Sequence, residues 1–156
     1  MKRVLTAVLL VVGLVSGATY VSAQMAHGPQ NLAEVKWGPA PNMLPAGAEV
    51  AVLFGDPSKA GPFAIRLKFP ANYNIPAHSH PTDENVTVTS GTFFVGMGEK
   101  FDQGSGKELP VGGFVSVPAT HRHFAWAGDQ ETIVQVHGVG PTDITFVNPA
   151  DDPRKK

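Results

Sequence analysis

The sequence predicts an all-β domain with many turns. Its 156 residues include 17 glycines and 14 prolines, and no long stretch has the periodicity of an amphipathic helix. In residues 63–69 every second side chain is a large apolar one, the pattern of a strand with one buried face. A chain of this length can bury the core of a single domain.

Further strands are expected where similar patterns lie between turn residues. Residues 84–89 alternate, with Val86 and Val88 on the same face as Glu84. Glycine and proline cluster between the segments, for example at 55–57 and 104–106. The other expected strands are residues 50–54, 92–97, 113–117, 123–126 and 132–139. By their apolar character we expect core or sheet-packing positions for Phe69, Ile75, Phe93, Met97, Phe124 and Trp126.

The N-terminus has the pattern of an export signal. A short basic start at residues 2–3 precedes an apolar run over residues 4–15, and Val21-Ser22-Ala23 offers small residues for cleavage. We expect cleavage after Ala23, a periplasmic or secreted location and no stable membrane insertion afterwards; an uncleaved anchor is the alternative. The expected organisation is a signal peptide at 1–23, one domain at 24–147 and a charged, frayed tail at 148–156.

Composition excludes several kinds of chemistry. The chain has no cysteine, so neither disulfides nor thiolate ligands are available. Its formal net charge of −1 gives no support for nucleic-acid binding. We therefore look for function in the histidines and carboxylates.

The stretch "PAHSHPTDENVTVTSG" concentrates such groups. His78 and His80 are two residues apart, so on a strand they point to the same side, and Glu84 shares the face of Val86 and Val88. A carboxylate buried beside imidazoles needs compensation, because an isolated buried charge is costly. A divalent metal compensates all three groups, although a His-x-His pair also occurs on ordinary surfaces.

Two motifs in this order resemble those of the cupin superfamily. The spacing of His78, His80, Glu84 and Gly91 fits the first cupin motif, and Gly112, Pro118 and His123 fit the second. Three positions depart from the pattern: Asn72 replaces the opening glycine of the first motif, while Thr120 and Ala127 replace a glycine and an asparagine of the second. These are turn or support positions, so the ligand set is unaffected.

The resemblance implies a double-sheet jelly-roll barrel, the cupin-type double-stranded β-helix. It also implies one divalent transition metal held by His78, His80, Glu84 and His123, with Glu84 able to leave the metal and act as a catalytic base. Such nitrogen and oxygen ligands suit iron, nickel, copper, zinc or manganese. Because a chain exported unfolded binds metal as it folds outside the cytoplasm, we expect copper or zinc.

Two classes of function remain. The open metal site favours a metal-dependent oxygenase, for example a dioxygenase, or a related oxidoreductase acting on a small organic molecule. The alternative is a non-catalytic periplasmic cupin that binds a metal or small ligand. His121 is expected at the barrel mouth or beside the metal, whereas Gln135 and His137 either line the cavity or lie outside, opposite Val134 and Val136. Outer strands and small size suggest a homodimer.

Overall fold

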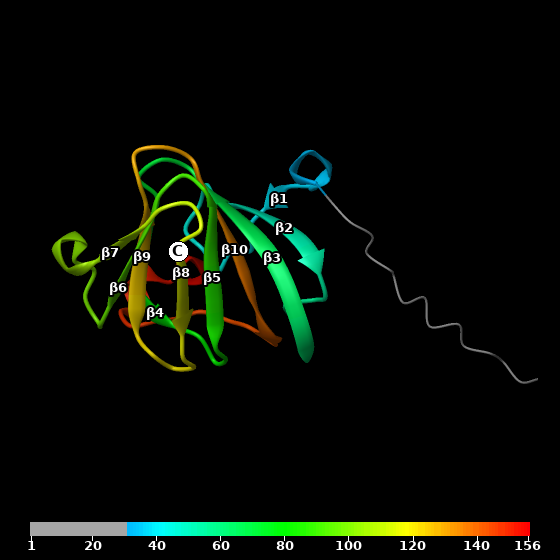
Figure 1. The fold of residues 1–156 in the computed structure, drawn as a ribbon. Helices are drawn as coiled ribbons and strands as arrows, with labels where there is room; N and C mark the ends of the chain where they lie inside the picture. Colours follow the sequence, from blue (N-terminus) through cyan, green and yellow to red (C-terminus); the bar gives the residue numbers. More distant parts are fainter. Residues whose placement is uncertain (1–30) are drawn as a thin grey trace, which may run out of the picture.

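Two antiparallel sheets form a barrel in the computed structural model, which describes residues 31–156 (Figure 1). The six-stranded sheet has the order β1-β2-β3-β10-β5-β8. Its strands are β1 (Gly38–Pro39), β2 (Glu49–Phe54), β3 (Gly61–Phe69), β10 (Thr132–Gly140), β5 (Glu84–Ser90) and β8 (Phe114–Val117). The long β10 pairs with β3 on one side and β5 on the other, so it forms the centre of this sheet.

The five-stranded sheet has the order β11-β4-β9-β6-β7. Its strands are β11 (Thr145–Phe146), β4 (Asn74–Ser79), β9 (His123–Ala127), β6 (Phe93–Met97) and β7 (Lys107–Leu109). The chain changes sheet between β3 and β4 and again between β4 and β5, which is the alternation of a jelly roll. This alternation brings segments far apart in sequence to the same end of the barrel.

The main core fills the space between the sheets. Val86 and Val88 from one sheet and Val95 from the other belong to this buried cluster. At one end Phe69 stacks against Tyr73 and Phe93, with ring centroids 5.0 and 5.7 Å away. Burial of these side chains stabilises the barrel through the removal of apolar surface from water.

A second apolar cluster covers the outer face of the five-stranded sheet. Phe94 and Trp126 stack with ring centroids 4.8 Å apart, and Phe101 packs against Trp126 at 5.7 Å. Phe124 completes this outer cluster and is only 1% exposed. All five residues of β9 are consequently buried, those facing inward in the barrel and those facing outward beneath this cluster.

Left-handed turns occur at four positions of the two cupin motifs. Gly91 and Gly112 have φ of 73° and 84°, which glycine adopts without a steric penalty. Asn72 and Thr120, the residues that replace motif glycines, have φ of 60° and 66°. At these two replaced positions the backbone therefore still adopts the left-handed conformation that favours glycine.

The expected strands all occur, with boundaries shifted by at most two residues. Short strands β1, β7 and β11 and the strand β4 were not expected, and Met97 is not a core residue, since it is 55% exposed. It is the last residue of β6 and is exposed at the end of the strand. The predicted signal peptide lies outside the described residues, and among residues 31–156 we find no helix with the length and hydrophobicity needed to span a bilayer.

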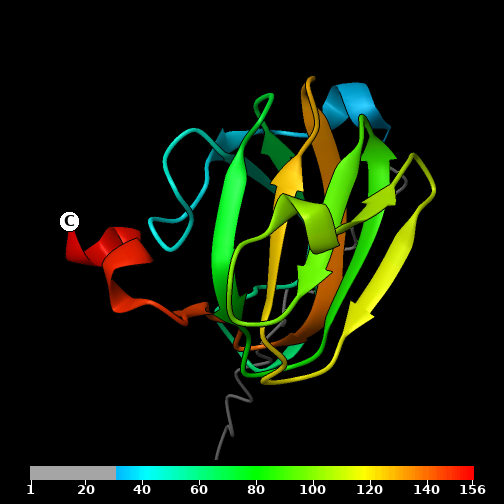
Figure 2. The same cartoon turned by 90° about the vertical axis from the view of Figure 1, so that its left-hand side faces the viewer.

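The C-terminal tail is folded, contrary to the expectation of a frayed end. It forms two 3-10 turns, η3 (Pro149–Asp151) and η4 (Pro153–Lys155), outside the two sheets (Figure 2). The side chains of Asn148 and Asp152 accept hydrogen bonds from Ala150 N and Arg154 N, and so cap the two turns. Two further 3-10 turns, η1 (Leu32–Glu34) and η2 (Gln103–Ser105), lie elsewhere.

Candidate metal centre

Three strand ends position the predicted ligands. His78 lies near the end of β4 and pairs with His123, the first residue of β9, while His80 follows β4 directly. Glu84 begins β5 on the opposite sheet. The barrel topology therefore gathers all four side chains at one end of the molecule.

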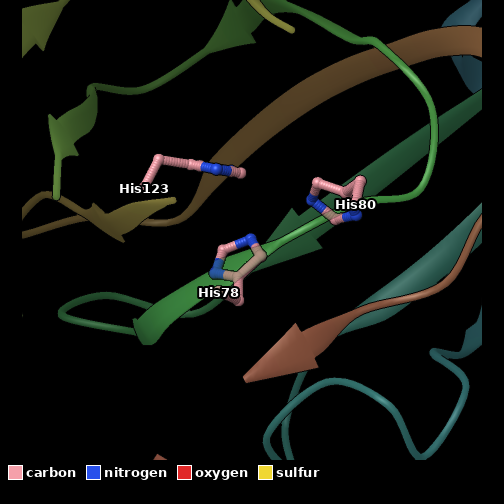
Figure 3. Close-up of side chains that lie close together, drawn as sticks. All are labelled: His78, His80 and His123. Carbon is pink, nitrogen blue, oxygen red and sulfur yellow. The ribbon is translucent and has the colours of Figure 1, made fainter. Parts of the chain in front are cut away.

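The three histidines face a common space (Figure 3). One ring nitrogen from each lies within 4.8 Å of those of the other two. Glu84 Oε2 approaches from the other sheet, 3.5 Å from His80 Nε2 and 3.4 Å from His123 Nε2. The four residues selected from the sequence thus come together in one cluster.

Backbone carbonyl groups hold the other nitrogen of each ring. The Nδ1 atoms of His78, His80 and His123 lie 2.7, 2.8 and 3.2 Å from the carbonyl oxygens of Pro76, Asp143 and His121. A carbonyl oxygen can only accept, so each Nδ1 carries the proton and donates it. Each Nε2 is then left as an unprotonated lone-pair donor, the form that binds a metal ion.

Burial sets the protonation of the cluster. His78 and His123 are 3% exposed. Burial, together with the neighbouring His123 and His80, lowers the pKa of His78 from 6.5 to about 3. For Glu84, burial acts to raise the pKa, but in the metal-free cluster a hydrogen bond from protonated His123 and the positive charge of protonated histidines outweigh burial and lower the pKa to about 2. Neutral His78 and an ionised Glu84 are the states that ligate metals.

The donor set fits a divalent transition metal. His80 Nε2 is buried and has no hydrogen-bond partner among the described residues, although buried polar atoms are normally satisfied. Three imidazole nitrogens and one carboxylate oxygen match the preferences of first-row transition metals. The cluster therefore indicates a metal ion, without determining which one.

An apolar cavity of about 180 Å³ opens beside this cluster. His78, His80 and Glu84 form part of its wall, whereas the side nearer His123 leads to a second, much smaller space of about 30 Å³ within the barrel. The rest of the wall is largely apolar and includes Met43, Leu44, Phe63, Ile65, Val136 and Ile144. For comparison, an apolar cavity of about 150 Å³ can hold benzene.

Other residues singled out in the sequence lie outside the cluster. His121 is exposed and contributes only its carbonyl oxygen, which accepts from His123. Val134 and Val136 are buried on the inner face of β10, so Gln135 and His137 point outward and do not line the cavity. The alternative that placed this pair outside is the one the fold adopts.

Sequence reasoning missed two kinds of contributor. The carbonyl oxygen of Asp143 orients His80, but a backbone group has no signature in the sequence. Met43 and Leu44 come from the segment before β2, and no local pattern indicates that this segment folds over the cavity. Their apolar character was the only available signal.

Residues 26–143 match the ChrR cupin-like domain family. This match covers most of the chain and includes both motifs. The chain belongs to that family. No curated protein matches this cupin in sequence.

Several solved structures share its fold. An enzyme described as the DMSP lyase DddQ from Ruegeria pomeroyi is 20% identical with a TM-score of 0.57 over 73% of this chain and 61% of that chain. A protein from Methylibium petroleiphilum, provisionally named an acetylacetone dioxygenase, is 20% identical with a TM-score of 0.60 over 85% and 89%. The polyketide cyclase RemF from Streptomyces resistomycificus is 18% identical with a TM-score of 0.58 over 82% and 90%.

These similarities establish the jelly-roll fold of this cupin. The chain spans only 61% of the length of the first of these structures. The three names describe different reactions, so the shared fold does not select one.

Proposed function

We propose that this cupin is an exported, mononuclear metal-dependent oxygenase or related oxidoreductase that acts on a small, largely apolar organic molecule. The observation that carries the proposal is a cluster of three Nε2 lone pairs and the Glu84 carboxylate beside an apolar cavity, with His78, His80 and Glu84 in the cavity wall. Ligands on strand ends hold their geometry, while a four-residue set leaves coordination positions open toward the cavity.

Each residue of the site has a defined part in this proposal. His78, His80 and His123 bind the metal through Nε2, and their Nδ1–H groups keep the rings oriented. Glu84 would be the fourth ligand or, where it does not ligate the metal, a carboxylate whose Oε2 can accept a proton from substrate. A redox-active metal would supply electron transfer with oxygen, whereas zinc would supply Lewis acidity.

The cavity determines which substrates fit. Its apolar wall excludes water and favours uncharged molecules of roughly the size of a single aromatic ring. Apart from the histidines and Glu84, its polar side chains are Ser58, Asp83 and Thr142. Such a wall offers few partners for a polyhydroxylated, sugar-like substrate.

Copper or zinc is the proposed metal. If the chain is exported unfolded, the site forms only outside the cytoplasm, and folding then selects the metal from the supply there. Affinity of such ligands rises along the divalent series to copper, with zinc below copper. Iron, nickel or manganese would require a biased supply.

A non-catalytic role is the second candidate. The scarcity of polar groups in the cavity favours it, because Glu84 and Asp83 are the only carboxylates in the wall and Glu84 already contacts His80 and His123. If Glu84 stays on the metal, Asp83 is the one carboxylate left in the cavity wall to transfer protons. The cupin would then be a periplasmic carrier or sensor of a metal or small ligand.

The test starts with protein exported through its own leader without added metal. Elemental analysis is expected to find one copper or zinc ion per chain, and oxygen consumption is then screened with phenolic compounds. Leu44→Phe, which fills the cavity from the segment before β2 and does not line the smaller space around His123, should keep the metal but abolish turnover. His123→Ala should lose both.

The outcomes separate the candidates. Oxygen uptake that both variants abolish supports the enzyme, while stoichiometric metal and ligand binding without turnover support the binder. Stoichiometric manganese or iron without copper or zinc would contradict the export argument. Absence of any metal from folded wild-type protein would contradict the metal centre itself.

A further inference from the structure

Arg154, in the C-terminal turn η4, contacts the segment that supports His80. Its Nη1 donates to Asp143 Oδ1 and its Nη2 to the carbonyl oxygen of Ile144, each at 2.8 Å. Its Nε and Nη2 also donate to the two carboxylate oxygens of Asp152, at 2.8 and 3.0 Å. The guanidinium thus holds three residues at once, and Asp152, only 7% exposed, fixes its orientation.

The held segment bears directly on the metal centre. The carbonyl oxygen of Asp143 accepts the Nδ1–H of His80 at 2.8 Å. Asp143 Oδ1, the atom that Arg154 contacts, also accepts from Ile144 N at 2.7 Å and so fixes the peptide unit that bears this carbonyl group. A continuous path of hydrogen bonds therefore leads from Arg154 through Asp143 to the imidazole of His80.

His80 depends on this support more than the other histidines do. Its supporting carbonyl is 63 residues away in sequence, whereas those of His78 and His123 are each two residues away. His80 also lies beyond the end of β4, in the connection to β5. Local chain geometry can orient the other two rings, but the ring of His80 needs the 143–144 segment in place.

We propose that Arg154 is a positioning residue for His80, so that the folded C-terminal turns set the affinity of the metal centre. Arg154 does not itself line the cavity and has no hydrogen bond to the predicted ligands. It touches the wall residue Ile144 only at the backbone carbonyl, and it acts on His80 through Asp143. The inference rests on the proposed metal site. It adds to that site a control point in a segment outside both sheets.

The test measures zinc affinity by competition with a chelating dye. Arg154→Ala should weaken zinc binding by roughly 10-fold, the low end of the effect of losing an outer-sphere partner of a ligand. Arg154→Lys should recover part of the loss, because an ammonium group reaches a carboxylate but cannot hold three residues in a planar fork. Lys155→Ala, which removes the same charge from the same turn, should bind zinc as the wild type does.

A second measurement distinguishes positioning from general stability. In metal-free protein, nitrogen-15 spectra of the imidazoles report exchange of each Nδ1–H with solvent. Arg154→Ala should accelerate exchange at His80 and leave His78 and His123 unchanged. A purely structural role would change all three rings or none.

The failure modes are separable. If wild-type protein binds no zinc, the proposed function fails, while the exchange measurement still decides the role of Arg154. Zinc affinity and His80 exchange equal to those of Lys155→Ala would overturn the inference alone. If Arg154→Ala does not fold, Arg154→Lys and Asp143→Asn carry the test, and wild-type behaviour in both would overturn it.

Discussion

Glu84 Oε2 lies 3.4 Å from His123 Nε2, although the two residues begin strands on different sheets. The candidate site therefore joins the two layers of the barrel at one end. A metal ion held there would link the layers as well as serve chemistry, because binding that requires the folded site stabilises the fold. The predictions below separate these contributions.

Each of the three histidines should contribute more to metal retention than Glu84 does. We expect His78→Ala, His80→Ala and His123→Ala each to reduce bound metal to a small fraction, since each removes an oriented Nε2 donor. Glu84→Gln should reduce it less, because an amide oxygen is still a ligand. Elemental analysis of purified protein checks this, with His121→Ala as the exposed control. Full occupancy in His123→Ala would show that the second motif is misassigned.

Stability of the metal-free protein should fall in mild acid. In the unfolded chain His78 takes up a proton as the pH drops through 6.5, whereas in the folded protein its pKa is lowered to about 3 by burial and by the adjacent His123 and His80. Between these values the unfolded state binds more protons, so the free energy of unfolding decreases as pH falls.

Urea denaturation of chelator-treated protein between about pH 7 and pH 5 measures this effect. That window lies above the ordinary pKa of Glu84, so His78 dominates over that carboxylate. His78→Gln cannot take the proton and should show a flatter dependence. A wild-type free energy of unfolding that rises on acidification would contradict the prediction.

The turn at Thr120 should be open to improvement. Thr120 has φ of 66°, a left-handed conformation that costs a residue with a Cβ about 1–2 kcal/mol. Thr120→Gly removes this cost, but the more flexible glycine loses more conformational entropy on folding, which costs roughly 0.5–1 kcal/mol. We therefore expect the free energy of unfolding to increase by up to about 1 kcal/mol. Asn72→Gly should gain less, because asparagine tolerates this region. The urea unfolding midpoints of the two variants and the wild type test this prediction. A Thr120→Gly variant less stable than the wild type would refute it.

The outer cluster should not tolerate a methyl group at Gly96. A Cβ there would lie 2.2 Å from Phe124 Cζ, and Phe124 is 1% exposed and cannot move aside. Gly96→Ala should lower the free energy of unfolding by about 1–3 kcal/mol, the usual cost of overpacking. Gly38→Ala, also in a strand but with no atom within 4 Å of the added Cβ, is the matched control. Equal stability of both variants would contradict this account.

Periodicity and motif spacing predicted the long strands and the convergence of the four site residues. This succeeded because a strand fixes the direction of alternate side chains, so His78 and His80 must share a side and Glu84 must share the face of Val86. The same logic could not find β4, since Pro76 interrupts its pattern, or the two-residue strands β1 and β11, which have no periodicity.

The support of His80 by residues far away in the sequence could not be predicted. The carbonyl group of Asp143 carries no side-chain information, and Arg154 belongs to a charged run that resembles a solvated tail. Only the folded chain brings Arg154 to Asp143. Likewise, Asn72 and Thr120 depart from the glycine pattern of the motifs, yet the backbone keeps left-handed turns there. The amide groups of Asn72 and Thr120 donate to the carbonyl oxygens of Gly128 and His80, which are long-range contacts without a local sequence pattern.

The burial of β9 on both faces divides the site into a rigid and an adjustable half. His123 starts β9, which is packed between the main core and the outer cluster. The backbone amide hydrogens of β9 should therefore be among the last to exchange in deuterium oxide. His80 instead lies in a connection whose anchor is a distant segment. A metal of different radius would therefore be accommodated by movement of His80, with His123 as the fixed reference point.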